Sequence, residues 1–105
     1  MQGALIYNNL LFENHATGIA LFQIDGGGPS SNAIIVHNTI LQASDGRWAI
    51  LIVNGATGAQ IFNNIIINQH PWRGSIVVNP DGLPGFQSNY NILSNSMNAS
   101  GDGSA

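Results

Sequence analysis

The sequence repeats one short pattern four times, and this repetition limits the possible folds more than any other feature. The repeats align on asparagines that are separated by 29, 26 and 27 residues: Asn9, Asn38, Asn64 and Asn91. In the first three repeats an apolar residue stands three positions before the asparagine and another stands two positions after it. In the fourth repeat Ser88 replaces the first of these apolar residues. A period of this length is typical of proteins in which each unit packs on the next.

The residues around each asparagine favour strands over helices. A second apolar strand follows the asparagine in the first three units, at 18–21, 49–52 and 75–78. The chain has 14 Ile, one Glu and no Lys, a composition that suits strands and turns. No window shows apolar residues at helical spacing. We therefore predict an all-β fold without helices, a short parallel β-solenoid of three to four coils.

The repeated unit has a counterpart in a known group of proteins. The Ile-x-x-Asn-x-Ile pattern of 35–40 and 61–66, with the Gly-Ile-x-Leu of 18–21, resembles the right-handed parallel β-helix repeat of the pectate-lyase-like superfamily. We assign residues 1–95 to coils and predict that the polar tail 96–105 is disordered. The leucine-rich repeat has a similar period, but its Leu-x-x-Leu-x-Leu run is absent.

The resemblance implies that the four corner asparagines stack into an internal ladder of amide hydrogen bonds. Asparagine suits such a position because it tolerates left-handed backbone, and because its side chain both donates and accepts hydrogen bonds. Buried polar groups must be paired, so we interpret these asparagines as structural residues and not as ligand contacts.

The charge content excludes two classes of partner. The chain has two Arg, five acidic residues and a formal net charge of -3. Nucleic acids and anionic membrane surfaces are bound mainly through clustered Lys and Arg, so neither is expected as a partner. No apolar run approaches the roughly 18 residues that a membrane span requires. The absence of cysteine excludes disulfides and thiolate catalysis.

Arginine and tryptophan residues gather at one predicted corner of the solenoid. Arg47 and Arg73 each follow their repeat asparagine by nine residues, and Gly18 has this offset in the first unit. Equivalent residues of adjacent coils lie about 4.8 Å apart, so the two guanidinium groups are expected side by side. Trp48 and Trp72 flank the same corner. Stacking on Trp and carboxylate binding by Arg are typical of saccharide recognition, so this corner predicts a binding site for an acidic polysaccharide.

Two histidines and one acid complete the candidate set. His15 and His70 share an offset of six residues from their asparagines, and both are assigned to substrate binding. Asp45 is the only acid in the two loops that carry the arginines.

Catalysis is implied only through the resemblance. A lyase or epimerase of that superfamily, acting on uronates, uses calcium bound by acids and a basic residue that removes a proton. Arg73 with Asp45 would take the catalytic roles here, and calcium is the one cofactor so implied. The five acids are dispersed along the sequence, so no metal site is predicted and the chain alone is not expected to be active. A hydrolase would need two or three close carboxylates, which Asp45 alone does not provide.

The alternative to saccharide binding is a structural β-solenoid without a ligand, as in the shaft of a surface adhesin or tailspike. The resemblance implies an extracellular or cell-surface location in either case. Uncovered ends of a coil stack template further association. We therefore expect end-to-end contact with a second copy or with neighbouring coils of a longer chain.

Overall fold

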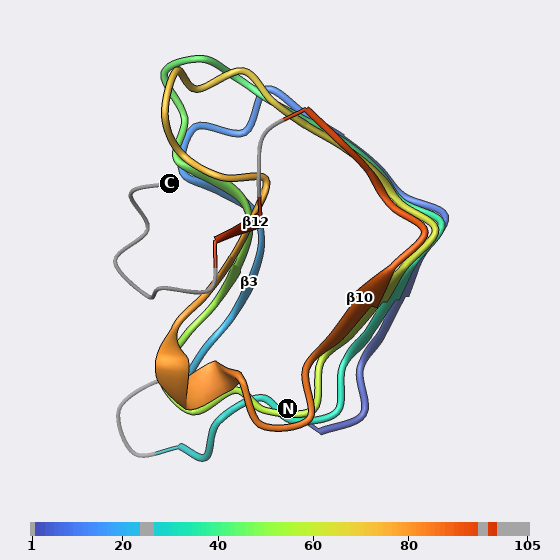
Figure 1. The fold of residues 1–105 in the computed structure, drawn as a ribbon, viewed down its shortest axis with the longest axis vertical. Helices are drawn as coiled ribbons and strands as arrows, with labels where there is room; N and C mark the ends of the chain where they lie inside the picture. Colours follow the sequence, from blue (N-terminus) through green and yellow to red (C-terminus); the bar gives the residue numbers. More distant parts are fainter. Residues whose placement is uncertain (1, 24–26, 95–96, 99–105) are drawn as a thin grey trace.

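The computed structural model describes residues 2–23, 27–94 and 97–98, which form an all-β parallel solenoid of about three turns (Figure 1). Three parallel sheets run along the stack, each with four strands. The first contains β1 (Leu5–Tyr7), β4 (Ile34–Val36), β7 (Gln60–Phe62) and β10 (Gln87–Asn89). The second contains β2 (Leu10–Phe12), β5 (Thr39–Gln42), β8 (Ile65–Asn68) and β11 (Ile92–Leu93). The third contains β3 (Thr17–Leu21), β6 (Trp48–Ile52), β9 (Ile76–Val78) and β12 (Met97–Asn98).

The fold class predicted from the repeats is confirmed. The single helical element among the described residues is a short 3-10 turn, η1 (Pro80–Gly82). This part of the chain contains no helix with the length and apolarity needed to cross a membrane. β12 lies within the predicted tail and pairs with β9 in parallel. The rest of that tail, 96 and 99–105, lies outside the described residues.

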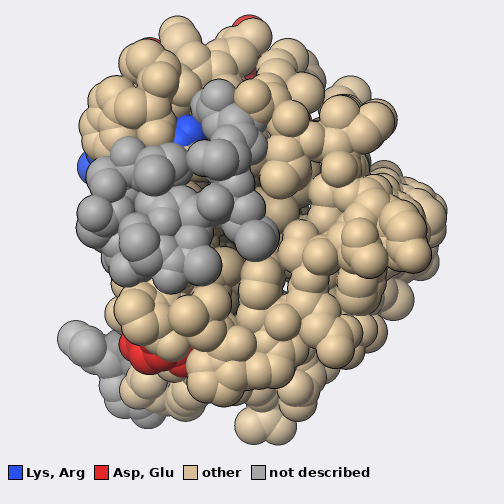
Figure 2. Space-filling view, viewed as in Figure 1, with Lys and Arg blue, Asp and Glu red and all other residues tan. Residues whose placement is uncertain are grey.

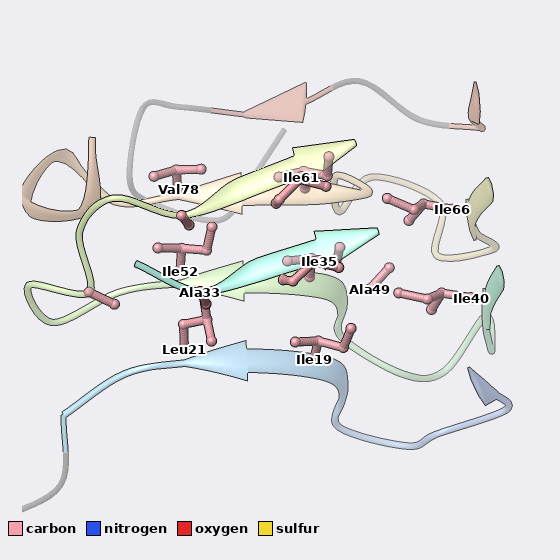
Figure 3. Close-up of a cluster of buried hydrophobic side chains, with 14 residues drawn as sticks. Ile19, Leu21, Ala33, Ile35, Ile40, Ala49, Ile52, Ile61, Ile66 and Val78 are labelled. Carbon is pink, nitrogen blue, oxygen red and sulfur yellow. The ribbon is translucent and has the colours of Figure 1, made fainter. Parts of the chain in front are cut away.

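The repeat spacing sets the strand register directly. Ile6 pairs with Ile35 and Ile35 with Ile61 in the first sheet, and each pair lies at the same offset from its asparagine. The inward columns of the three sheets meet in one apolar core (Figure 3). Its fully buried large residues include Ile35, Ile40, Ile50, Ile52, Ile61, Ile66 and Ile76. Stacking β-branched side chains in register gives the solenoid its hydrophobic stabilisation.

The asparagine ladder is present at the corner between the first and second sheets, where β10 ends on the right of Figure 1. Asn9 Nδ2 donates to Asn38 Oδ1 at 3.0 Å, Asn38 Nδ2 to Asn64 Oδ1 at 3.2 Å, and Asn64 Nδ2 to Asn91 Oδ1 at 3.0 Å. Asn38 and Asn64 are each only 1% exposed. The ladder therefore satisfies amide groups that water does not reach, as buried polar groups require.

The left-handed backbone at this corner belongs to a different residue from the one that we predicted. The residues with positive φ directly precede the ladder asparagines: Asn8, His37, Asn63 and Tyr90, at 56 to 59°. The ladder asparagines themselves are not among the positive-φ residues. The chain thus turns at one residue and uses the next for hydrogen bonding. Asparagine is required at the ladder position for its amide and not for its backbone freedom.

A second left-handed column stands six residues before the ladder, where the third sheet gives way to the first. Its members are Gly3, Asn32, Gly58 and Gly85, with φ of 57 to 74°. The backbone N–H of each of the first three donates to a carbonyl of the next coil, for example Gly58 N to Pro84 O at 2.9 Å. Glycine and asparagine recur here because they adopt left-handed backbone at low cost.

The loop before β3 in the first coil is shorter than the repeat offsets indicated. Gly18 was expected level with the two arginines, but the register pairs Thr17 with Trp48 and Ile19 with Ile50, which puts Gly18 beside Ala49. Ala16 instead lies next to Arg47 in the stack, because the backbone N–H of Arg47 donates to the Ala16 carbonyl at 2.9 Å. The loop before β3 has two fewer residues than the offset from the asparagine assumes, so the offset of nine holds for the second and third coils only.

This close approach makes Gly18 sensitive to substitution. A Cβ added there would lie 2.7 Å from the Ala49 carbonyl oxygen and 3.0 Å from Cγ2 of Ile40. We expect Gly18→Ala to lower the free energy of unfolding by about 1–3 kcal/mol, because the backbone must move to relieve the overlap. Chemical denaturation measures the loss. Gly28→Ala is the matched control, since its Cβ would meet nothing within 4 Å. An equal effect of both substitutions would contradict the steric explanation.

Candidate functional site

Most of the predicted site residues lie in the second-coil and third-coil loops that join the second sheet to the third, in green and gold at the top of Figure 1. Trp48 is the first residue of β6, and His15 lies in the first-coil loop between β2 and β3. In the second coil this loop runs from the end of β5 to β6, and in the third coil from the end of β8 to β9. Figure 2 shows that most of the visible face is uncharged, with small areas of arginine and of acid. The few charged side chains at these loops therefore dominate the local electrostatics.

Arg73 packs against both tryptophans. Its guanidinium carbon lies 4.7 Å from the ring centroid of Trp48 and 4.3 Å from that of Trp72. Both distances lie within the range of cation–π attraction. Arg73 is half-buried, whereas the Trp72 side chain is 50% exposed. One arginine thus joins aromatic residues of adjacent coils while part of Trp72 faces solvent.

The loop that carries this cluster is built around Asn68 and His70. The backbone N–H of His70 donates to Asn68 Oδ1 at 3.0 Å. His70 Nδ1 accepts from the backbone N–H groups of Trp72 and Arg73, at 3.2 and 3.1 Å. Its ring meets the Trp72 ring edge-on, with centroids 4.7 Å apart. His70 Nδ1 thus helps to shape the loop that carries Trp72 and Arg73, and the predicted role of His70 in substrate binding stays a prediction.

The two arginines are neighbours through their backbones but have different surroundings. Asn68 Nδ2 donates to the Arg47 carbonyl at 3.0 Å and to the Arg73 carbonyl at 3.4 Å, so the main chains of the two coils are adjacent, as the offsets predicted. The Arg47 side chain is exposed and forms no salt bridge with a described acid. Arg73 turns to the indole rings. This arrangement separates the roles of the two cations, with Arg47 open to solvent and Arg73 held by aromatic packing.

His15 and Asp45 form a separate pair. His15 Nδ1 lies 3.7 Å from Asp45 Oδ2, and both side chains are highly exposed, at 82% and 73%. Asp45 therefore pairs with the histidine of the preceding coil and not with either arginine. An exposed pair of this kind contributes little to stability.

The geometry offers little to the catalytic roles that the resemblance implies. A base must first give up its proton, which arginine in proteins does not do, and the Arg73 guanidinium packs against two indole rings. Among the described residues no group of three or more His, Cys, Asp or Glu side chains could hold a metal ion. The arrangement is suited to binding an anion beside an aromatic surface.

A second polar column was missed by the sequence reasoning. Gln42 and Asn68, paired in register between β5 and β8, are almost completely buried. Gln42 Nε2 donates to the Ala16 carbonyl at 3.1 Å, and Asn68 Nδ2 donates to the Gly74 carbonyl at 3.0 Å. The available signal was a polar residue four positions after each ladder asparagine: Glu13, Gln42, Asn68 and Asn95. Asn68 thereby fastens the loops that carry Arg47 and Arg73, and Gln42 fastens the corresponding loop of the first coil.

Comparison with protein-family models, curated proteins and solved structures finds no match.

Proposed function

We propose that the chain is a polysaccharide-recognising β-solenoid that binds an acidic saccharide along the corner carrying Arg47 and Arg73. The observation that supports this most is the combination of an exposed arginine with a half-exposed Trp72, whose ring is held by contacts with Arg73 and His70. A sugar ring stacks its apolar face on an indole, and a uronate carboxylate accepts charge-assisted hydrogen bonds from a guanidinium. Fixing the indole before binding lowers the entropy cost of recognition.

Arg47 is the residue that would bind the carboxylate in this proposal, and Trp72 would provide the stacking surface. Arg73 and Trp48 would support Trp72 from the side facing the protein. His15 and Asp45 would lie at the edge of the bound chain, where their exposed side chains offer hydrogen bonds to hydroxyl groups. A saccharide that spans adjacent coils would follow the stack, because equivalent residues repeat every 4.8 Å or so.

The proposal includes the finer assignment to the pectate-lyase-like superfamily, with a right-handed coil and an extracellular or cell-surface location. Three parallel sheets and a corner asparagine ladder support that assignment. Turnover of uronates would require acids that the described residues do not cluster. Binding without catalysis is therefore the activity that we assign to this chain alone.

Tryptophan fluorescence during titration with oligouronides and matched neutral oligosaccharides tests the proposal. We expect a saturable change with oligouronides, because part of Trp72 is exposed at the proposed site. Arg47→Ala should weaken that binding about tenfold, the effect of losing about 1.4 kcal/mol from one charge-assisted hydrogen bond. Repeating the titration with calcium and with a chelator shows whether the ion contributes. A flat response to every sugar would overturn the proposal.

Asn63→Asp is the matched control for charge. It makes the net charge more negative by one, as Arg47→Ala does, but Asn63 lies at the ladder corner, away from the loops. Aspartate also tolerates the left-handed backbone of this residue. Equal weakening by both variants would show that net charge alone attracts the ligand. Equal affinity for neutral and acidic sugars would remove the role proposed for Arg47.

The second candidate is a structural solenoid without a ligand. It is favoured by the contacts of Arg73 and His70 within the protein, since both side chains help to hold the loop. This candidate predicts no response in the titration and a loss of stability, not of binding, when Arg73 is replaced.

A further inference from the structure

A histidine ring closes the third-coil loop between β8 and β9. His70 Nδ1 accepts hydrogen bonds from the backbone N–H groups of Trp72 and Arg73, at 3.2 and 3.1 Å. Pro71, between His70 and Trp72 in the chain, has no N–H and a fixed φ, which suits the second position of a tight turn. The imidazole therefore takes the place of a backbone carbonyl as the acceptor that holds residues 70–73 in a turn.

This geometry requires a neutral His70 ring. A backbone N–H is always a donor, so the ring nitrogen that faces two of them must act as an acceptor. A neutral imidazole has one acceptor nitrogen, whereas an imidazolium carries hydrogen on both nitrogens and has none. Protonation of Nδ1 would therefore replace two hydrogen bonds with three N–H groups that face one another. The turn at 70–73 is incompatible with the charged ring.

The cations beside His70 act in the same direction. The guanidinium carbon of Arg73 lies 4.3 Å from the centroid of the Trp72 ring, and His70 meets the same ring edge-on at a centroid distance of 4.7 Å. Arg47 belongs to the adjacent second-coil loop, which Asn68 joins to this one through the carbonyl groups of both arginines. A charged His70 would be a third cation among these two, and like charges repel.

The other ionisable side chains near these loops have different surroundings. Asp45, in the second-coil loop, lies 3.7 Å from Nδ1 of His15 in the first coil, and Glu13 also belongs to the first coil. His37 lies at the ladder corner. The strands that flank the two loops, β5, β6, β8 and β9, contain no ionisable side chain. Among the described residues, backbone N–H groups donate to the ring of His70 and to no other histidine ring.

Opening of this turn would move the aromatic and cationic groups of the loop and leave the coil in place. Trp72 and Arg73 belong to the turn, and the Arg73 guanidinium carbon lies 4.7 Å from the ring centroid of Trp48 in the adjacent coil. The strands on either side of the loop pair with the second coil independently of residues 70–73. The change is therefore local, because the paired strands and the core columns do not depend on it.

We propose that His70 is a pH-dependent switch: its neutral ring holds the turn at 70–73, and its protonation releases Trp72 and Arg73 from their present contacts. Histidine is the side chain that ordinarily changes charge between about pH 5 and 8. The ring is half-buried, so solvent protons reach it. The consequence for a ligand rests on the proposed function: an acidic saccharide would be bound near neutral pH and released on acidification.

NMR titration of the unmodified chain from about pH 8 to about pH 4.5 tests the switch without a ligand, over the range in which histidines titrate. Ring ¹⁵N shifts should show Nδ1 of His70 without hydrogen at the start. The backbone amide signals of Trp72 and Arg73 should then move with the midpoint of the ring. Indole ring currents shift the Arg73 side-chain protons, and this shift should be lost in the same step. Ring protonation that leaves these signals unchanged, or a ring that stays neutral throughout, would overturn the proposal.

His70→Asn keeps an acceptor at this position and removes its titration. The side-chain oxygen of asparagine accepts from backbone N–H groups shortly after it in the chain, as in Asx turns. We therefore expect the variant to retain the ring-current shifts of Arg73 and to show no dependence on pH in this range. A transition that persists in His70→Asn would overturn the proposal. If the variant does not fold, the titration of the unmodified chain still decides.

His15→Asn and His37→Asn are the matched controls, since each makes the same substitution at another histidine. Asparagine fits position 37 because Asn8 and Asn63 occupy the equivalent positions with the same left-handed backbone. Both controls should show the loop transition of the unmodified chain. Loss of the transition in either control would assign it to a different histidine and overturn the role of His70.

Oligouronide titration about one pH unit above and one below the NMR midpoint separates the switch from the proposed function. Binding to the unmodified chain should weaken about tenfold at the lower pH, the effect of losing about one stacking contact. His70→Asn should bind equally at both, which also controls for ionisation of the sugar. Tighter binding in acid would show that the imidazolium attracts the carboxylate, and would overturn release. A loop transition without saccharide binding at either pH would overturn the proposed function and support the switch.

Discussion

Asn64→Ala should destabilise the protein by about 3–5 kcal/mol, because it removes a side chain on which both neighbouring coils depend. Asn64 Oδ1 accepts from the backbone N–H and Nδ2 of Asn38, and its own Nδ2 donates to the carbonyl groups of Ile35 and Phe62 and to Asn91 Oδ1. Alanine leaves these groups buried without partners, and each unsatisfied group carries its full desolvation penalty. Urea denaturation followed by circular dichroism measures the loss.

Asn9→Ala is the internal control for this prediction. Asn9 occupies the same column and has the same chemistry, but it lies in the first coil and is exposed. Water can replace its hydrogen bonds, so the expected loss is about 1 kcal/mol or less. Similar losses for Asn9→Ala and Asn64→Ala would show that burial does not set the strength of the ladder.

Ile66→Ala should lower the free energy of unfolding by about 2–5 kcal/mol, the range for truncating a buried aliphatic residue. Ile66 is fully buried, and its neighbours in the stacked column are Ile40 and Leu93. Alanine leaves a cavity between two coils, and the register of the backbone ladders on both sides prevents them from closing it. Thermal and chemical unfolding should show the loss together, as for a single cooperative unit.

Ile65→Ala provides the matched comparison in the same strand. Ile65 directly precedes Ile66, carries the same side chain and points outward with 42% of it exposed. Its truncation should cost less than about 1 kcal/mol, because it removes little buried surface and leaves no cavity. If the two substitutions had equal effects, the inward and outward faces assigned to the second sheet would be wrong.

The stack and the proposed binding corner depend on each other through the loop at 69–75. The strand register brings the third coil next to the second, and only this adjacency lets Arg73 reach the ring of Trp48. The polar column of Gln42 and Asn68 then ties each loop to the sheets below it. Substitutions in that column should therefore change the proposed ligand surface without contacting it.

The sequence by itself determined the coil and its register. The sequence alone identifies the equivalent positions, through Asn9, Asn38, Asn64 and Asn91 and the apolar residues at constant offsets from them. In a parallel solenoid, equivalent positions must stack, because a slip of one residue would turn an inward column such as Ile40 and Ile66 to solvent. The fold class and the strands could therefore be predicted from periodicity, whereas the ladder was predicted from the resemblance to the β-helix repeat.

Only the tertiary structure decided what the loops do. The shortened first loop moved Gly18 beside Ala49, the left-handed turn fell one residue before the ladder, and Arg73 took up the faces of Trp48 and Trp72. Offsets from the repeat asparagines predict which residues of adjacent coils stack on one another. The conformations of the loops and the side-chain rotamers are set by packing between coils. A local repeat thus encodes the stack, whereas the arrangement of the exposed arginine and aromatic side chains depends on contacts between residues more than 20 positions apart.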